Sequence, residues 1–179
     1  MRMSKFEEVT LAKDLSLNGP GFSVIAIIDG EPIVLESSYL KPKGTHGEKL
    51  TAIYDEMDRL FKEYKPKHVV REKGFSRFAN TTQTLFKVVG VSDYLSHKNG
   101  CSKVDEIPTT TVKKSVTGDG NASKEEVASA VFNAFQITNT DDYYKTVKSG
   151  KDKGKKKLID DMTDSLAVGL AFYKKKGLI

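Results

Sequence analysis

The chain of 179 residues is long enough for one folded domain, 1–179, with a buried core, and its 38% hydrophobic and 30% charged residues are ordinary for a globular protein. Its net charge of +5 permits an anionic partner, whereas the single cysteine, Cys101, excludes an internal disulfide and a thiolate metal site. The chain has no apolar run of membrane-spanning length and no apolar N-terminal signal, so we expect no membrane partner and a cytoplasmic location.

Apolar runs in the first forty residues predict three antiparallel strands joined by hairpins. The runs cover 7–16, 22–28 and 31–40, with a Gly-bearing turn and an Asp-Gly turn between them. From 46 to 64, apolar residues recur every three or four positions, which predicts an amphipathic helix. A turn and a short buried strand that ends at Glu72 are expected next.

The second half of the chain is predicted to be mostly helical. A helix over 80–95, with Gly90 as a kink or an end, leads to a strand over 103–108. A Gly-bearing loop follows, and Ser123 with Glu126 three residues later has the spacing of a capping box at the start of the next helix. A final helix closes the chain.

Four carboxylates stand where an unpaired charge is costly. Asp14 and Glu72 end apolar runs typical of buried strands, and Asp161 and Asp164 share one face at the start of the last helix. Helix capping explains one or two acids of that helix but not Asp14 and Glu72. Oxygen ligands without clustered histidines or cysteines favour Mg²⁺ or Mn²⁺, which predicts a metal-dependent nuclease. Asp160, rotated by about 100° from Asp161, is an ambiguous neighbour.

A lysine-rich segment precedes the acids of the last helix. Residues 145–157 contain seven lysines, one aspartate and two glycines, a composition that predicts a mobile basic loop. This loop is either a solvated linker or a phosphate-binding element, and its position beside the acids favours binding to DNA. The candidate DNA-binding residues of the loop are Lys151, Lys153, Lys155, Lys156 and Lys157. No phosphate-binding P-loop is present, so no nucleotide cofactor is expected.

The order of the predicted elements matches an α/β fold of the ribonuclease H-like type, with a mixed central sheet flanked by helices. Motif by motif, the chain resembles RuvC-type Holliday junction resolvases from about Val9 to Ala171. The motifs that carry the resemblance are, in chain order, DLSLNGPGFSVI, REKGF, VKKSVTGDGNASKEEV and DDMTDSLAVGLA. The DLSLNGPG form and the lysine insertion are similar to bacteriophage-encoded members, which implies a location in the host cytoplasm.

The resemblance implies a catalytic site with two divalent ions, Mg²⁺ or Mn²⁺. The implied metal ligands and catalytic acids are Asp14, Glu72, Asp161 and Asp164. Lys113 and Lys124 resemble two lysines beside the scissile phosphate, and Lys114 replaces Lys113 if the strand register differs. The implied reaction is paired hydrolysis of opposed strands in four-way or other branched DNA, leaving 5′-phosphate and 3′-hydroxyl ends.

The same resemblance implies further contacts with DNA. Phe75 matches an aromatic beside the central bases of the junction, and Arg77 is either a phosphate ligand or a loop charge. Two opposed cuts imply a homodimer. The helix over 80–95 is the expected dimer surface, and its candidate exposed positions are Thr84, Lys87 and Val91. The alternatives are a non-catalytic junction-binding protein and a related nuclease that acts on other branched or hybrid substrates.

Overall fold

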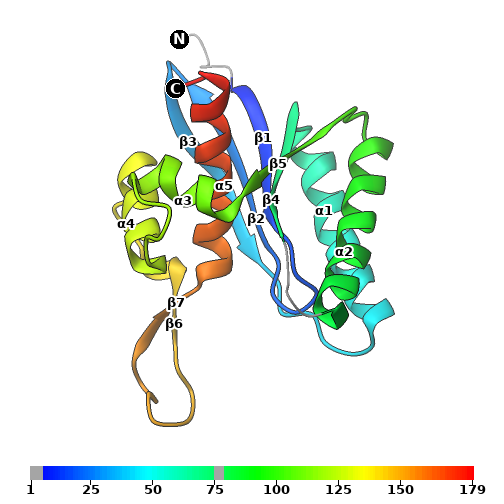
Figure 1. Ribbon diagram of the computed structural model, residues 1–179, viewed down its shortest axis with the longest axis vertical. Helices are drawn as coiled ribbons and strands as arrows, with labels where there is room; N and C mark the ends of the chain where they lie inside the picture. Colours follow the sequence, from blue (N-terminus) through cyan, green and yellow to red (C-terminus); the bar gives the residue numbers. More distant parts are fainter. Residues whose placement is uncertain (1–5, 75–78) are drawn as a thin grey trace.

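The chain folds around a five-stranded mixed sheet in a computed structural model that describes residues 6–74 and 79–179 (Figure 1). The strands are β1 (Glu7–Asp14), β2 (Gly21–Ile28), β3 (Glu31–Tyr39), β4 (His68–Lys73) and β5 (Val104–Pro108). Their order in the sheet is β3-β2-β1-β4-β5, with antiparallel pairing among β1, β2 and β3 and parallel pairing of β4 with β1 and β5. The predicted ribonuclease H-like α/β architecture is therefore confirmed.

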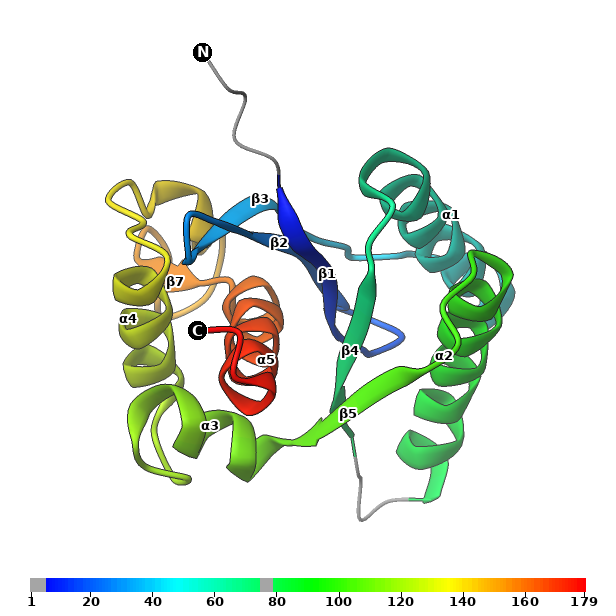
Figure 2. The same ribbon diagram turned by 90° about the horizontal axis from the view of Figure 1, so that it is seen from above.

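Helices cover both faces of the sheet (Figure 2). They are α1 (His46–Tyr64), α2 (Ala79–Lys98), α3 (Thr109–Thr117), α4 (Lys124–Ala134) and α5 (Asp160–Lys176). Neighbouring side chains of a strand point to opposite faces, so Leu11 packs with the α1 and α2 layer, whereas Ala12 packs with α3, α4 and α5. Two hydrophobic cores thus lie back to back across β1. None of the helices within the described residues is long and apolar enough to span a membrane.

Two glycines allow α5 to approach the sheet closely. A Cβ atom at Gly169 would lie 2.5 Å from Ile25 Cδ1, and one at Gly21 would lie 1.8 Å from the carbonyl oxygen of Asp161. The backbone contact at Gly21 admits only a residue without a Cβ atom, whereas at Gly169 the Ile25 side chain would have to move. The first turn of α5, which carries Asp160 and Asp161, is therefore held against the start of β2.

The capping boxes at the starts of α1 and α4 form as local chemistry requires. Glu126 Oε2 accepts a hydrogen bond from the Ser123 backbone at 2.7 Å, and Ser123 Oγ accepts one from the Glu126 backbone at 3.2 Å. Thr45 and Glu48 make the same pair of interactions at the start of α1. The capping box predicted at Ser123 is confirmed.

Two helical features differ from the sequence prediction. Residues 109–117 form α3 rather than a strand or loop, because Val112 is buried in the core and this packing outweighs the weak helix propensity of three threonines. Helix α2 continues through Gly90 to Lys98 without a break. Gly90 is exposed, and its cost of about 1 kcal/mol relative to alanine is small beside the packing of the helix.

The lysine-rich segment, predicted as a loop, contains two short paired strands. β6 (Tyr144–Thr146) pairs antiparallel with β7 (Lys156–Leu158), and a single-turn 3₁₀ helix, η1 (Asp141–Tyr143), precedes them. Tyr143 and Leu158 are buried at the base of this hairpin and anchor it to the core. The strand pairing was not predicted, because the segment is rich in lysine and has only one buried apolar residue at each end, which gives no alternating strand pattern.

Candidate active site

The ends of β1 and β4 bring Asp14 and Glu72 to the same edge of the sheet. These strands are parallel neighbours with Lys13 opposite Arg71, so Asp14 and Glu72 follow side by side. The carboxyl ends of parallel strands meet at one edge of an α/β sheet, which is where such proteins place their ligands. Thr109, the first residue of α3 after β5, donates a hydrogen bond from Oγ1 to Glu72 Oε1 at 2.6 Å.

A pocket of ≈ 290 Å³ opens at this edge. Its polar and charged lining residues are Asp14, Glu72, Asp164, Thr109, Lys113 and Lys124. The structure thus brings together three of the four predicted acids and both predicted lysines. Asp161 is not among the lining residues: its carboxylate lies toward Gly19, where an added Cβ atom would stand 3.4 Å from Asp161 Oδ2.

Lys124 connects α4 to the acids of α5. Its ammonium is ion-paired with Asp160 and lies 3.4 Å from Asp164 Oδ2. Lys113 donates a hydrogen bond to the carbonyl oxygen of Ala122 at 2.6 Å, which orients its side chain. Lys114 is exposed and faces a separate surface hollow, so Lys113 is the lysine of this pair that lines the pocket.

Comparisons with known proteins identify the family. The family model described as crossover junction endodeoxyribonuclease RuvC matches residues 11–145, three quarters of the chain. The chain belongs to the RuvC family. Relatives of that name from Cytophaga hutchinsonii and Prochlorococcus marinus subsp. pastoris are 27% and 28% identical; the matches cover 96% and 92% of this chain and 78% and 95% of the relatives.

Solved RuvC-like structures have the same fold. Thermus thermophilus RuvC in complex with a Holliday junction substrate superposes with a TM-score of 0.76 at 20% identity, covering 96% of this chain and 98% of that one. The yeast mitochondrial Holliday junction resolvase Ydc2 gives a TM-score of 0.68 at 11% identity over 99% of this chain and 82% of its own. Identities this low support the fold alone.

Burial, and then neighbouring carboxylates, raise the pKa values of the acids at the RuvC-like pocket. Burial, followed by the charges of Glu72, Asp164 and Asp161, raises the pKa of Asp14 to about 8. Burial also raises the pKa of Asp164 to about 6, against the opposing charge of Lys124. The pKa of Asp161 is raised by burial and by Asp160. Without a bound cation, these partly buried acids are therefore costly to ionise.

Asp160 behaves differently from its neighbours. Burial by itself would raise its pKa, but the hydrogen bond and the charge of Lys124 outweigh burial, and the net effect lowers the pKa. The same ion pair, opposed by burial, raises the pKa of Lys124. Asp160 therefore stays ionised and acts as the counter-ion of Lys124.

The donor set and its charge fit a hard divalent cation. RuvC-family nucleases are divalent-metal dependent, and the candidate ligands supply only carboxylate oxygens, which suit Mg²⁺ or Mn²⁺. Burial, helped by neighbouring carboxylates, raises the pKa of Asp14 and Asp164, and a divalent cation beside them would offset the cost of ionising these acids. Within residues 6–74 and 79–179, no three such side chains are arranged to hold one ion, so the carboxylates must turn to share it.

Some predicted DNA contacts lie elsewhere or outside the described residues. Phe75 and Arg77 fall in the segment 75–78, which the structure does not describe. The five candidate lysines of the hairpin are exposed and lie on β7 and the turn before it, outside the acidic pocket.

Sequence reasoning missed Thr109 and two nearby cations. Lys145 and Lys41 both lower the pKa of Asp161 through their charges, so they add to the positive field on its side of the site. Thr109 could have been found from its position directly after β5, at the edge where parallel strands end. Lys41 carries no such signal, because only the folded chain brings the end of β3 near α5.

Proposed function

We propose that this protein is a divalent-metal-dependent, structure-selective DNA endonuclease that resolves four-way junctions by paired phosphodiester hydrolysis. One observation carries the proposal: in a chain of the RuvC family, acids from β1, β4 and α5 line one pocket with Lys113 and Lys124. Excess carboxylates beside two lysines suit a reaction in which metal ions and a phosphate occupy the same site.

The metal ligands in this proposal are Asp14, Glu72, Asp161 and Asp164, with Mg²⁺ or Mn²⁺ as the ion and two ions per site. When bound, such ions make water a stronger nucleophile near neutral pH and neutralise charge on the leaving oxygen. Glu72 is oriented for this role by Thr109. Asp161 requires a turn of its side chain away from Gly19 to join the others.

Lys124 and Lys113 hold the scissile phosphate in this proposal. Lys124 is the first residue of α4, where free backbone amides and the helix dipole already favour an anion. Asp160 keeps the Lys124 ammonium at the pocket. Lys113 approaches from α3, with its direction fixed by the Ala122 carbonyl. The two lysines thus reach the pocket from different elements.

A homodimer is the natural geometry for two opposed cuts, and we propose the outer face of α2 as its interface. The inner face is held to the sheet: Lys13 donates to Ser92 Oγ at 2.6 Å, and Arg71 is ion-paired with Asp93. On the outer face, Phe86 and Tyr94 are each 63% exposed. They stand eight residues apart, with exposed Gly90 midway between them, so all three share one stripe.

The exposed positions expected on this helix are only partly supported. Lys87 is exposed, but Thr84 and Val91 are half-buried, and Val91 packs against the core of the α1 and α2 layer. The large exposed side chains beside them, Phe86 and Tyr94, supply more apolar area for association. The interface is therefore proposed to centre on Phe86 and Tyr94.

Four-way junctions are favoured as substrate because the Thermus thermophilus relative was solved with a Holliday junction. Because of its DLSLNGPG motif and lysine insertion, we further propose that the protein is a bacteriophage-encoded member of the family that acts in the host cytoplasm.

Single-turnover cleavage of four-way, three-way, flap and RNA–DNA hybrid substrates tests the assignment of the four-way junction as substrate. The four-way junction should be cut fastest, in opposed strands. A preference for the hybrid would contradict the proposal, and binding without cleavage would favour a non-catalytic junction-binding protein.

A further inference from the structure

The β6–β7 hairpin accounts for the net positive charge of the whole chain. Its segment 144–158 has seven lysines and one aspartate, a net charge of +6, which exceeds the +5 of the entire protein. The remaining residues together therefore carry a net charge of −1. Any long-range attraction of a polyanion must consequently come mainly from this hairpin.

Most of these charges are not used within the protein. Lys155 pairs with Asp152 at 2.7 Å, and Lys156 pairs with Asp141 at 2.6 Å. Lys148, Lys151 and Lys153 are exposed and have no acidic partner within the described residues. These three ammonium groups are available to an external anion.

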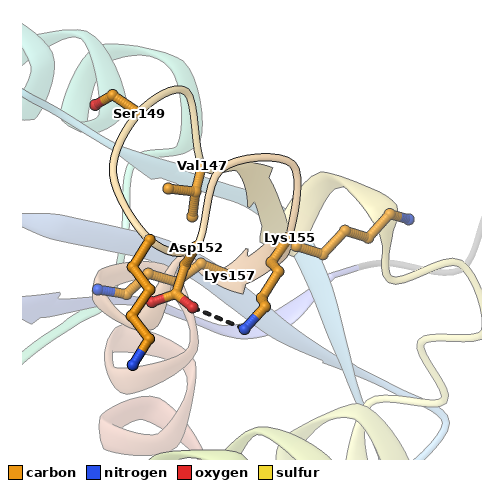
Figure 3. Close-up of a pocket in the computed structure, with 7 residues that line it drawn as sticks. Val147, Ser149, Asp152, Lys155 and Lys157 are labelled. Carbon is orange, nitrogen blue, oxygen red and sulfur yellow. Dashed lines mark hydrogen bonds and ion pairs between the residues drawn. The ribbon is translucent and has the colours of Figure 1, made fainter.

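The hairpin has a defined shape that presents these charges. The Val147 amide donates to the Lys155 carbonyl at 2.9 Å, and the Gly154 amide donates to the Val147 carbonyl at 2.8 Å. Gly150 and Gly154 have φ values of 83° and 86°, which allow the tight turns of the tip. The tip curls around a concave space of ≈ 390 Å³ lined by four lysines, Asp152, Ser149 and Val147, and Lys151 is the one of the three unpaired lysines that lines it (Figure 3).

The hairpin also has a defined place relative to the cleavage site. Its second strand ends at Leu158, two residues before α5 begins with Asp160, and its tip extends away from the body of the protein (Figure 1). Seven residues from Tyr144 to Gly150 would span about 20 Å if fully extended at about 3.3 Å each, and the curled tip makes this an upper limit for the reach of the hairpin. A DNA strand rises about 3.4 Å per nucleotide, so this reach corresponds to at most about six base pairs.

We propose that the hairpin is an arm-binding element that contacts the phosphates of one duplex arm within about six base pairs of the cleaved bond. This inference rests on the proposed function, from which we take the polyanion to be junction DNA. The unpaired lysines, the concave tip and the position beside α5 supply the place of contact. Its role is to add affinity, while the pocket at Asp14 and Glu72 performs hydrolysis.

A charge cycle between protein and DNA tests this contact. Binding of a four-way junction is measured in a chelator as a function of salt, with wild type and with the triple variant Lys148→Gln, Lys151→Gln, Lys153→Gln. The matched control replaces Lys174, Lys175 and Lys176 with Gln at the opposite end of α5. Each substrate is prepared with natural phosphates or with neutral methylphosphonates at the phosphates three to six base pairs from the cut in one arm.

The hairpin variant should reduce the slope of log K against log salt by about 3, because each lost phosphate contact contributes roughly 0.9. Neutral linkages should weaken wild type and the control variant, and should leave the hairpin variant nearly unchanged. Equal losses for wild type and the hairpin variant, or a wild-type salt slope in that variant, would overturn the proposal. The readout is binding, so a wild type that binds with this pattern without cutting would refute the nuclease assignment and leave the hairpin contact supported.

Discussion

Replacement of Thr109 by valine should weaken metal binding and slow cleavage about tenfold. Thr109 Oγ1 donates to Glu72 Oε1 at 2.6 Å, and valine has the same shape without the hydroxyl. A hydrogen bond to a charged group is worth about 1.5–3 kcal/mol, and the lower end applies because Thr109 is exposed. A loss of about 1.4 kcal/mol corresponds to a factor of ten. Loss of a side chain that orients a metal ligand typically costs a similar factor.

The assay is single-turnover cleavage of a four-way junction at saturating protein, titrated with Mg²⁺. Thr109→Val should raise the half-saturating Mg²⁺ concentration about tenfold, and Thr109→Ser, which keeps the hydroxyl, should restore it. Thr111→Val is the matched control, since Thr111 lies in the same turn of α3, is exposed and makes no side-chain hydrogen bond within the described residues. Equal Mg²⁺ curves for Thr109→Val and Thr111→Val would refute the orienting role.

Three further predictions concern packing, charge and assembly. Gly21→Ala should lower the free energy of unfolding by about 1–3 kcal/mol, because its Cβ atom would stand 1.8 Å from the Asp161 carbonyl oxygen. Gly19→Ala is the control: its Cβ atom would stand 3.4 Å from a side-chain atom, so it should lower the melting temperature far less. Equal melting temperatures for the two variants would contradict the packing argument. Folding raises the pKa of Asp14 from 3.8 to about 8, so the folded protein binds a proton that the unfolded chain releases between these pH values. In a chelator, the melting temperature should therefore fall as pH rises from about 4 to about 8, more steeply for wild type than for Asp14→Asn. Parallel curves for the two proteins would contradict the raised pKa. The double variant Phe86→Glu, Tyr94→Glu should sediment as a monomer, whereas the control Phe6→Glu, which also replaces an exposed aromatic, should remain a dimer. A double variant that remains a dimer would contradict an interface on α2.

Sequence patterns predicted the sheet and the long helices because their information is local. Alternating or continuous apolar runs defined β1, β2 and β3, and the three-to-four-residue period from His46 to Tyr64 matched α1 to the residue. Helix α3 escaped prediction because Val112 alone provides its buried anchor, a tertiary contact with no local periodicity. The paired strands β6 and β7 were not predicted for a similar reason: their buried anchors are the single residues Tyr143 and Leu158.

The candidate site was predictable in its residue types but not in its detailed arrangement. Asp14 and Glu72 were found from charge at the ends of apolar strands, and the pocket contains both. The division of labour on α5 was not predictable: Asp164 lines the pocket, Asp160 pairs with Lys124, and Asp161 lies toward Gly19. These differences depend on where the loop after β1 and the start of α4 meet α5, which is set by packing between distant segments.

Cleavage of a four-way junction with mapped cut sites, by wild type and Asp14→Asn, each with Mg²⁺ and with a chelator, tests the central claim most directly. Wild type with Mg²⁺ should make paired cuts in opposed strands. The chelator, or Asp14→Asn, should abolish the cuts while junction binding in the chelator is retained. Cleavage at the wild-type rate by Asp14→Asn, or cleavage that persists in the chelator, would contradict the assignment of the pocket as a metal-dependent nuclease site.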